Sequence, residues 1–220
     1  MAKIGTGFTI PGEAGCEALT LALAQKWGAD CVRDSDGTLL SPEILSSGMA
    51  VYSTLCLVRS VNDWAQENMD KLQRTFLMSR PVLAEDELTR IQPLEDFFTE
   101  QFVIAPNDDP TEFWQVFDRT LQAELTDWTW DGKWVTINHT VPGHLYTVNF
   151  LATRVWEEIS MYNHITNQWG DKAHLMAVEP RYPETQKVLL DALVRWCDAH
   201  PDTQIVRFTS LFYNFCWMWS

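Results

Sequence analysis

Residues 13–38 read EAGCEALTLALAQKWGADCVRDSDGT, and this stretch predicts the class of the fold. Up to Trp27 its apolar residues recur at a helical period, and Gly28 stands where many helices end. Residues 29–33 are short and partly β-branched, and a cluster of turn-forming residues follows them. A helix that leads into a strand and then a loop is typical of a chain built from repeated βα units.

Further segments continue this alternation of helices and strands. Ser41-Pro42-Glu43 resembles a helix N-terminus, with a capping serine and a proline at the first helical position. Residues 50–58 form an apolar run of strand length. Residues 183–200 have an amphipathic helical pattern that leads into a strand at 204–209. Two βα units are therefore clear, one near each end of the chain.

The pattern changes between about residues 95 and 140, where antiparallel strands are predicted. Residues 113–117 and 128–137 favour strands, and Asp131-Gly132 within the second of them is a typical hairpin turn. A buried strand is predicted at 145–156, and a helical or irregular segment follows it. We interpret the region of antiparallel strands as an insertion into the βα repeat.

We therefore expect an α/β fold: an incomplete (β/α)8 TIM-type barrel, about the first half of one, with a β-rich insertion at about residues 95–140. About four βα units fit into 220 residues, whereas eight units usually need roughly 250 residues before insertions. The apolar segment 211–219 ends the sequence without a polar cap. We expect this chain, 1–220, to be the N-terminal part of a longer protein, with the remaining barrel and the downstream domains absent.

Composition excludes several classes of function. Sixteen Lys and Arg against thirty Asp and Glu give a net charge of -14, which would repel nucleic acid. The sequence holds no long apolar run and no secretory leader, so we expect a cytoplasmic protein with no membrane partner. The five cysteines and five histidines lack metal-site spacing, and no phosphate-binding glycine loop or serine-hydrolase elbow is present. We expect neither a metal nor a nucleotide cofactor.

Three polar groups follow predicted strands, where the reactive residues of parallel sheets and barrels stand. These groups are Arg33-Asp34, Glu157-Glu158 and Arg207. Arg33 fits two interpretations equally: a fork that binds sugar hydroxyls or an anion, and a structural ion pair with Asp34. Residues 161–171 concentrate aromatic, amide and imidazole groups that suit a sugar site, although an ordinary helix start also explains them. The abundant tryptophans fit both an aromatic core and stacking platforms for sugars.

Several of these strings, in this order, resemble one family. They are residues 27–38, 161–172 and 206–213. They are similar to the 1,3-β-galactosyl-N-acetylhexosamine phosphorylases, also called lacto-N-biose or galacto-N-biose phosphorylases, whose relatives include galactosyl-rhamnose phosphorylases. The resemblance implies a catalytic barrel at the N-terminus of a longer, usually dimeric glycosyltransferase of carbohydrate metabolism. It also implies inverting phosphorolysis of lacto-N-biose or galacto-N-biose to α-galactose 1-phosphate and N-acetylhexosamine.

The resemblance also implies roles for particular residues. Arg33, Asn163 and Arg207 match substrate-site or phosphate-site positions, Glu157 matches an acidic position, and Ile159 matches a position linked to acceptor preference. Inorganic phosphate is the implied co-substrate. The general-acid aspartate of the family falls beyond Ser220, so this chain alone is expected to be inactive. A truncated sugar-binding remnant, a galactosyl-rhamnose phosphorylase and an ordinary glycosidase are the alternatives.

Overall fold

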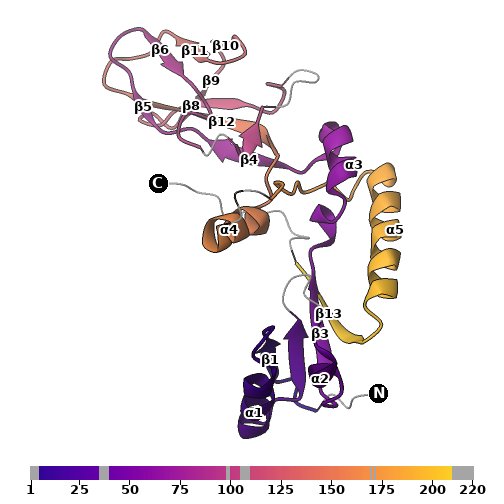
Figure 1. Ribbon diagram of the computed structural model, residues 1–220. Coiled ribbons are helices and arrows are strands. Elements are labelled where there is room, and N and C mark those ends of the chain that lie inside the picture. The colour runs from indigo at the N-terminus through magenta and orange to yellow at the C-terminus, as the bar shows by residue number, and fades with distance from the viewer. Residues whose placement is uncertain are drawn as a thin grey trace. The chain divides into compact units, whose positions relative to one another are not determined.

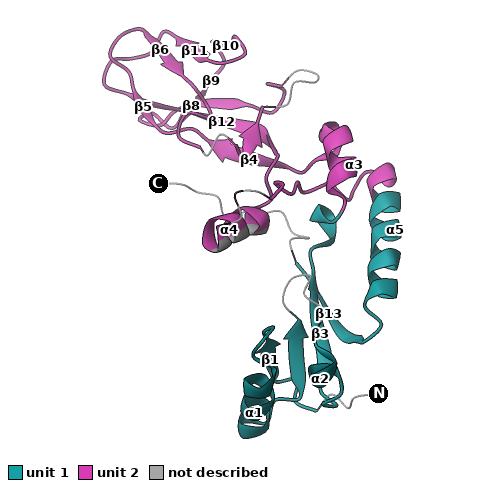
Figure 2. Ribbon diagram, viewed as in Figure 1, with its two compact units in different colours: residues 1–60, 186–212 teal, residues 61–185, 213–220 magenta. Residues whose placement is uncertain are grey.

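The computed structural model describes residues 5–34, 40–97, 100–104, 110–168, 170 and 172–209. The apolar segment 211–219 that ends the sequence lies outside the described residues. The chain divides into two compact units (Figure 2). The first unit takes in residues 1–60 and 186–212, and the second takes in 61–185 and 213–220.

The first unit contains a four-stranded, all-parallel sheet (Figure 1). Its strands are β1 (Thr9–Gly12), β2 (Cys31–Asp34), β3 (Ala50–Leu55) and β13 (Thr203–Phe208), and they pair in the order β1-β2-β3-β13. Each of these strands therefore lies beside the next parallel strand along the chain. This sequential order is that of a (β/α) barrel, whereas a doubly wound sheet reverses its strand order at a switch point.

Helices connect these parallel strands, and local sequence signals set their ends. Helix α1 (Glu17–Trp27) joins β1 to β2 and stops at Gly28, which adopts the left-handed conformation with φ of 72°. Helix α2 (Pro42–Leu45) begins at Ser41, whose side chain accepts a hydrogen bond from the Ile44 amide. Helix α5 (Pro183–Ala199) precedes β13. A short 3-10 turn, η1 (Leu57–Arg59), follows β3.

A small apolar core lies between the parallel sheet and its first two helices. Val32 of β2 and Val51 of β3 are buried with Ile44 of α2, and Leu21 of α1 packs against them. Because side chains alternate along a strand, the residues beside Val32 and Val51 face the opposite side of the sheet. The described helices α1 and α2 therefore cover one face of the sheet.

The second unit is built from antiparallel strands. Its larger sheet centres on β12 (Leu145–Arg154), with β4 (Arg74–Met78) on one side and β8 (Gln115–Asp118) on the other. The other strands of that sheet are β9 (Ala123–Leu125), β5 (Val82–Leu83) and β7 (Phe102–Val103). A smaller sheet pairs β10 (Trp128–Trp130), β11 (Val135–Asn138) and β6 (Leu88–Ile91). The unit also holds α3 (Asn62–Glu67), η2 (Met69–Lys71) and α4 (Glu158–Asn167).

Many of the aromatic residues fill the core of this second unit. Trp114 is 6% exposed, and its ring lies against those of Trp128, Trp130 and Phe150 at centroid distances of 6.5, 4.9 and 5.7 Å. Such rings each bury a large apolar area, and edge-to-face contacts add to their packing. For these four residues, the core interpretation of the aromatic content holds.

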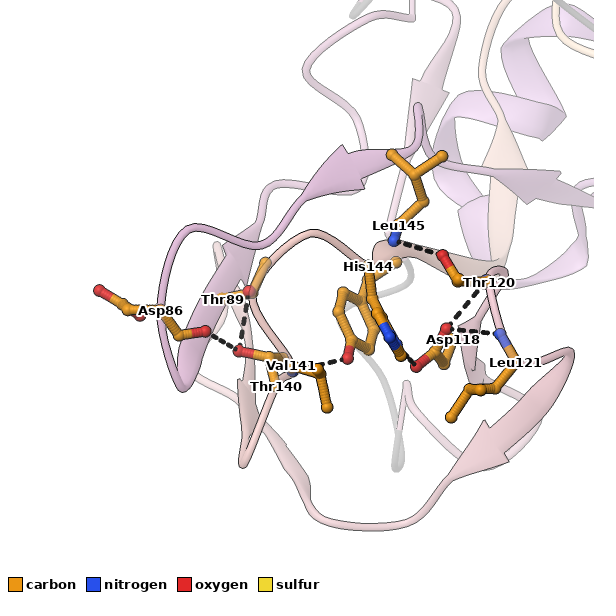
Figure 3. A network of polar contacts seen from close by, with 10 residues as sticks. Asp86, Thr89, Asp118, Thr120, Leu121, Thr140, Val141, His144 and Leu145 are labelled. Carbon is orange, nitrogen blue, oxygen red and sulfur yellow. Dashed lines mark hydrogen bonds and ion pairs between the residues drawn. The ribbon is translucent and has the colours of Figure 1, made fainter.

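A buried polar network ties β8 to the start of β12 in this unit (Figure 3). The Nδ1 atom of His144 lies 2.7 Å from Oδ2 of Asp118, and Oδ1 of Asp118 accepts hydrogen bonds from the backbone amides of Thr120 and Leu121. Burial raises the pKa of Asp118, but its hydrogen bonds to His144 and Leu121 outweigh this effect and hold the pKa below 3.8. Asp118 is therefore explained by structure and need not be assigned a catalytic role.

Two expectations need correction. The antiparallel strands run from Arg74 to Arg154, a wider range than the expected 95–140, because β4, β5 and β6 are short and carry little sequence periodicity. The strand predicted at 145–156 is the antiparallel centre of the second unit. It is not one of the parallel strands of the βα repeat, since its apolar residues pair with β4 and β8.

Candidate functional site

On the face of the parallel sheet opposite helices α1 and α2, two arginines and two hydroxyl-bearing side chains lie on three neighbouring strands. In the register of the sheet, Arg33 of β2 pairs with Tyr52 of β3, and Thr54 of β3 pairs with Arg207 of β13. Paired residues of parallel strands point to the same face, and Tyr52 and Thr54 are two positions apart on one strand. All four side chains therefore share one face. We call it the arginine face.

Both guanidinium groups on the arginine face are available for a ligand. Arg33 and Arg207 are exposed, and in the part of the chain that the structure describes neither has a hydrogen-bond or ion-pair partner. One strand, β3, lies between the two arginine backbones, which are therefore roughly 10 Å apart across the sheet. Their partners on β3 are two residues apart, which adds a shift of roughly 7 Å along the strands. Two unpaired cations at this spacing form a locally positive surface in a chain of charge -14.

The interpretation of Arg33 as a structural partner of Asp34 does not hold in the described residues. Asp34 points to the other face of the sheet, where its Oδ2 atom accepts a hydrogen bond of 2.5 Å from Ser53. The Ser53 hydroxyl also lies 2.8 Å from the hydroxyl of Thr203. The carboxylate next to Arg33 in sequence is thus used elsewhere, and the guanidinium is left for solvent or a ligand.

Glu157 occupies a different setting in the second unit. It is fully buried and caps α4, because its Oε2 atom accepts a hydrogen bond of 2.9 Å from the Ser160 amide. The backbones of Ile159 and Asn163 lie within α4, one and five residues after its first residue. Their side chains lie outside what the structure describes.

Helix α4 is fixed to the rest of its unit by an unusual number of polar contacts. Arg154, at the end of β12, donates a hydrogen bond of 2.6 Å to Glu158 and another to Gln73. The Ser160 hydroxyl accepts a hydrogen bond from the Leu175 amide. Both Arg154 and Glu158 are buried, so their charges stabilise each other away from water.

Aromatic rings close around the same helix. The ring of Trp156 stacks on His174 with a centroid distance of 3.4 Å, and the ring of His164 packs edge-on against both. The two nitrogens of His164 lie 2.7 Å from the Ser160 carbonyl oxygen and 3.0 Å from that of Lys172. Within residues 161–171, His164 therefore helps to hold α4 in place, together with Trp156 and His174 from outside that segment.

The structure thus brings together some of the predicted site residues. Arg33 and Arg207 share one face of one sheet, as their places near strand ends predicted. Glu157 follows an antiparallel strand of the other unit, so the argument that placed it at the end of a parallel barrel strand was wrong. The convergence of Glu157, Ile159 and Asn163 with the two arginines stays a prediction that rests on the family resemblance.

Sequence reasoning missed the hydroxyl groups on the arginine face. Tyr52 and Thr54 lie inside the apolar run 50–58, which reads only as a buried strand. The signal that could have found them is their alternation with the buried residues Val51, Ser53 and Leu55. Alternating exposure along β3 indicates that one face of the sheet is open at this strand.

The described residues hold neither a metal-binding cluster nor a membrane-spanning helix. Across residues 5–209, apart from the gaps named above, no cluster of three or more His, Cys, Asp or Glu is placed to hold a metal ion. Within the same residues, no helix has the length and apolar character needed to cross a membrane.

Comparison with known proteins gives a consistent picture. The family model described as the lacto-N-biose phosphorylase N-terminal TIM barrel domain matches residues 6–220. A D-galactosyl-β-1→4-L-rhamnose phosphorylase of Lachnoclostridium phytofermentans is 52% identical over 217 residues, which cover 97% of this chain and 30% of that protein.

Two further relatives are 1,3-β-galactosyl-N-acetylhexosamine phosphorylases. The one from Bifidobacterium longum subsp. longum is 38% identical over 94% of this chain and 28% of its own length. The one named Cphy3030, from Lachnoclostridium phytofermentans, is 35% identical over 97% of this chain and 30% of its own length. The chain spans about 30% of the length of these curated relatives. The family match over residues 6–220 agrees with the four parallel strands in sequential order and with the two arginines on their open face. The chain therefore belongs to the lacto-N-biose phosphorylase family, as its N-terminal TIM-barrel domain.

Proposed function

We propose that the complete protein catalyses phosphorolysis of a β-galactosyl disaccharide, which yields α-galactose 1-phosphate and a free acceptor sugar. The observation that carries this proposal is the pair of unpartnered guanidinium groups, Arg33 and Arg207, on one face of the parallel sheet. An anionic co-substrate would need such a cationic surface, because the net charge of -14 on this chain would otherwise repel it. Membership of a phosphorylase family supports phosphate as that anion.

The reaction requires few chemical groups from the protein. A phosphate oxygen attacks the anomeric carbon of galactose on the side opposite to the leaving oxygen, and a new carbon–oxygen bond forms. The glycosidic bond breaks, its electron pair goes to the leaving oxygen, and a carboxylic acid supplies the proton to that oxygen. An inverting hydrolase also needs a carboxylate to activate water, but phosphate is already an anionic nucleophile. A single acid and several anion-binding donors are therefore sufficient.

The residues of this chain would supply the anion-binding donors. Arg33 and Arg207 would bind phosphate and substrate hydroxyls through charge-assisted hydrogen bonds. Asn163, Glu157 and Ile159 would contribute from α4, as the family resemblance implies. The same resemblance assigns the general acid to an aspartate beyond Ser220, so we propose that residues 1–220 alone do not catalyse the reaction. Inorganic phosphate is the co-substrate, and the proposal includes no metal and no organic cofactor.

Two classes of acceptor sugar remain as candidates. The relative at 52% identity is named for a galactosyl-β-1→4-L-rhamnose substrate, and the relatives at 38% and 35% are named for galactosyl-N-acetylhexosamines. The higher identity favours L-rhamnose as the acceptor for this protein, although lacto-N-biose and galacto-N-biose were the substrates first expected. Acceptor choice depends on few contacts, so the three sugars need direct comparison.

The reverse reaction tests this proposal. The complete protein is incubated with galactose 1-phosphate and, separately, with L-rhamnose, N-acetylglucosamine and N-acetylgalactosamine, and released phosphate is measured. We expect phosphate release with at least one acceptor and the highest rate with L-rhamnose. A higher rate with either N-acetylhexosamine would reverse the acceptor assignment. Phosphate release with none of the three, from folded protein, would overturn the proposed function.

A further inference from the structure

Thr54 stands out among the hydroxyl groups of the parallel sheet. It is the residue before the last in β3, its side chain lies on the arginine face, and its register partner is Arg207. It is partly exposed, and within the described residues its hydroxyl has no hydrogen-bond partner. Neighbouring strands are about 4.8 Å apart, so the side chains of Thr54 and Arg207 leave the sheet side by side on the same face.

Ser53, the residue before Thr54 in β3, has a hydroxyl that is used for structure. Ser53 is 1% exposed and points to the other face of the sheet, where its hydroxyl contacts both Asp34 and Thr203 at 2.5 and 2.8 Å. The fold therefore satisfies the polar atom on one face of β3. It leaves the next polar atom, on the arginine face, without a partner.

A second hydroxyl, that of Thr209, belongs to a residue placed in space beside the end of β3. Thr209 directly follows β13, and its amide donates a hydrogen bond of 2.9 Å to the Leu55 carbonyl oxygen, which places it beside the end of β3. Its Oγ1 atom is buried, and among the residues that the structure describes it has no hydrogen-bond partner. A buried hydroxyl without a partner destabilises the fold, and such a group commonly marks the place of a water or a ligand.

Resting on the proposed function, we infer that Thr54 donates its hydroxyl to the phosphate group held by Arg207 and Arg33, and so contributes to phosphate binding rather than to the fold. The hydroxyl adds a neutral donor between two cationic ones. Such a donor strengthens binding to an oxygen that carries negative charge in both the bound and the reacting state. Nothing in the apolar core of the first unit depends on it, because its hydroxyl points away from α1 and α2.

Isosteric replacement tests this inference in the complete protein. Thr54→Val keeps the shape and the β-branched side chain that suits a strand, but it removes the donor. We expect the KM for phosphate to rise roughly 10-fold or more, the size expected for one hydrogen bond to a charged group, and the KM for the disaccharide to stay the same. Thr54→Ser, which restores a hydroxyl, should bring the phosphate KM back towards the wild-type value.

Ser53→Ala is the matched control on the other face of the same strand. It should lower the melting temperature and leave the KM for phosphate unchanged. An unchanged phosphate KM in Thr54→Val, or a change confined to the disaccharide KM, would overturn the inference. Wild-type protein that is folded but shows no phosphate-dependent activity would instead overturn the proposed function. Should Thr54→Val fail to fold, Thr54→Ala measured for phosphate binding by calorimetry replaces it, and wild-type affinity there would also overturn the inference.

Discussion

The charges of Arg33 and Arg207 matter because no carboxylate in the described residues compensates them. Both side chains lie on the open face of the parallel sheet, and the carboxylate nearest in sequence, Asp34, is hydrogen bonded to Ser53 on the other face. An arginine paired with a carboxylate would contribute little to binding an anion, because its charge would already be compensated. The described part of the chain keeps these two guanidinium groups uncompensated.

Replacement of Arg207 by alanine should therefore damage turnover and not stability. Loss of one donor that stabilises developing negative charge typically costs about 10²- to 10³-fold in rate, and we expect a fall of that order in kcat/KM for phosphorolysis by the complete protein. Arg90→Ala is the matched control, since Arg90 also lies on a strand but is paired with Asp131 at 3.0 Å. Wild-type kinetics in Arg207→Ala would remove this residue from the site.

A second residue, Asp30, is predicted to stabilise the folded protein. It lies just before β2, and its Oδ2 atom accepts hydrogen bonds from the backbone amides of Gly5, Thr6 and Gly7 at 2.8, 2.5 and 3.2 Å. Desolvation of the carboxyl raises its pKa, but these backbone hydrogen bonds outweigh it and lower the pKa below 3.8. The N-terminal ends of barrel strands are typically stabilising regions rather than sites of catalysis.

Because the pKa of Asp30 is lower in the folded protein, its contribution to stability is present above 3.8 and is lost as the pH falls through the lowered value. Asp30→Asn should therefore lower the melting temperature at neutral pH, and the difference from wild type should shrink once the pH falls below 3.8. Thermal unfolding followed by circular dichroism across this range measures it. A difference that stays constant with pH would show that the charge of Asp30 has no part in the effect.

At the scale of elements, α4 combines a structural cap with predicted site residues. Glu157 is fully buried at its N-terminus, and the helix is anchored by the Arg154–Glu158 pair. A carboxylate that is the cap of a helix cannot move without loosening the residues that follow. The positions of Ile159 and Asn163 therefore depend on Glu157, whatever direct part it has in binding.

Two substitutions separate these roles of Glu157. Glu157→Ala removes the acceptor for the Ser160 amide and should destabilise the protein by about 1 kcal/mol or more, which thermal unfolding will detect. Glu157→Gln keeps an oxygen acceptor, so its melting temperature should stay near that of wild type while kcat/KM falls. Glu43→Ala, at an exposed position in the first turn of α2, is the control. Full activity in Glu157→Gln would leave Glu157 with a capping role alone.

The elements also show which features of the fold could be predicted from the sequence. Gly28, Ser41 and Asp131-Gly132 are local signals, and each gave the expected helix end, helix start or hairpin because the determining contacts lie within a few residues. Strands β5 and β7 have two residues each and no periodicity to detect. Their existence depends on pairing with β12, which is a tertiary interaction.

Strand direction was the feature that an apolar pattern could not reveal. Residues 145–154 are apolar enough for a parallel strand, and only pairing with β4 and β8 makes β12 antiparallel. The same limit applies to the candidate site. Arg33 and Arg207 could be selected from their places at strand ends, but Thr54 needed the observed register and exposure to be noticed.

At the scale of the whole molecule, the chain is a barrel-type βα repeat interrupted after its third parallel strand. Residues 61–185 of the second unit, which hold all of its described antiparallel strands, are inserted between β3 and β13. The chain therefore leaves the repeat through the connection that follows the C-terminal end of β3 and returns to it before β13. Connections at these ends carry the active sites of TIM barrels. The candidate residues Glu157, Ile159 and Asn163 thus belong, by connectivity, to a long elaboration of one such connection.

The most direct test of the central claim is the product of the forward reaction. The complete protein is incubated with phosphate and galactosyl-β-1→4-L-rhamnose, and the galactose product is identified by phosphorus and proton magnetic resonance. We expect α-galactose 1-phosphate, formed only when phosphate is present and in equal amount to free L-rhamnose. Release of free galactose that does not depend on phosphate would contradict the account, because water and not phosphate would then be the nucleophile.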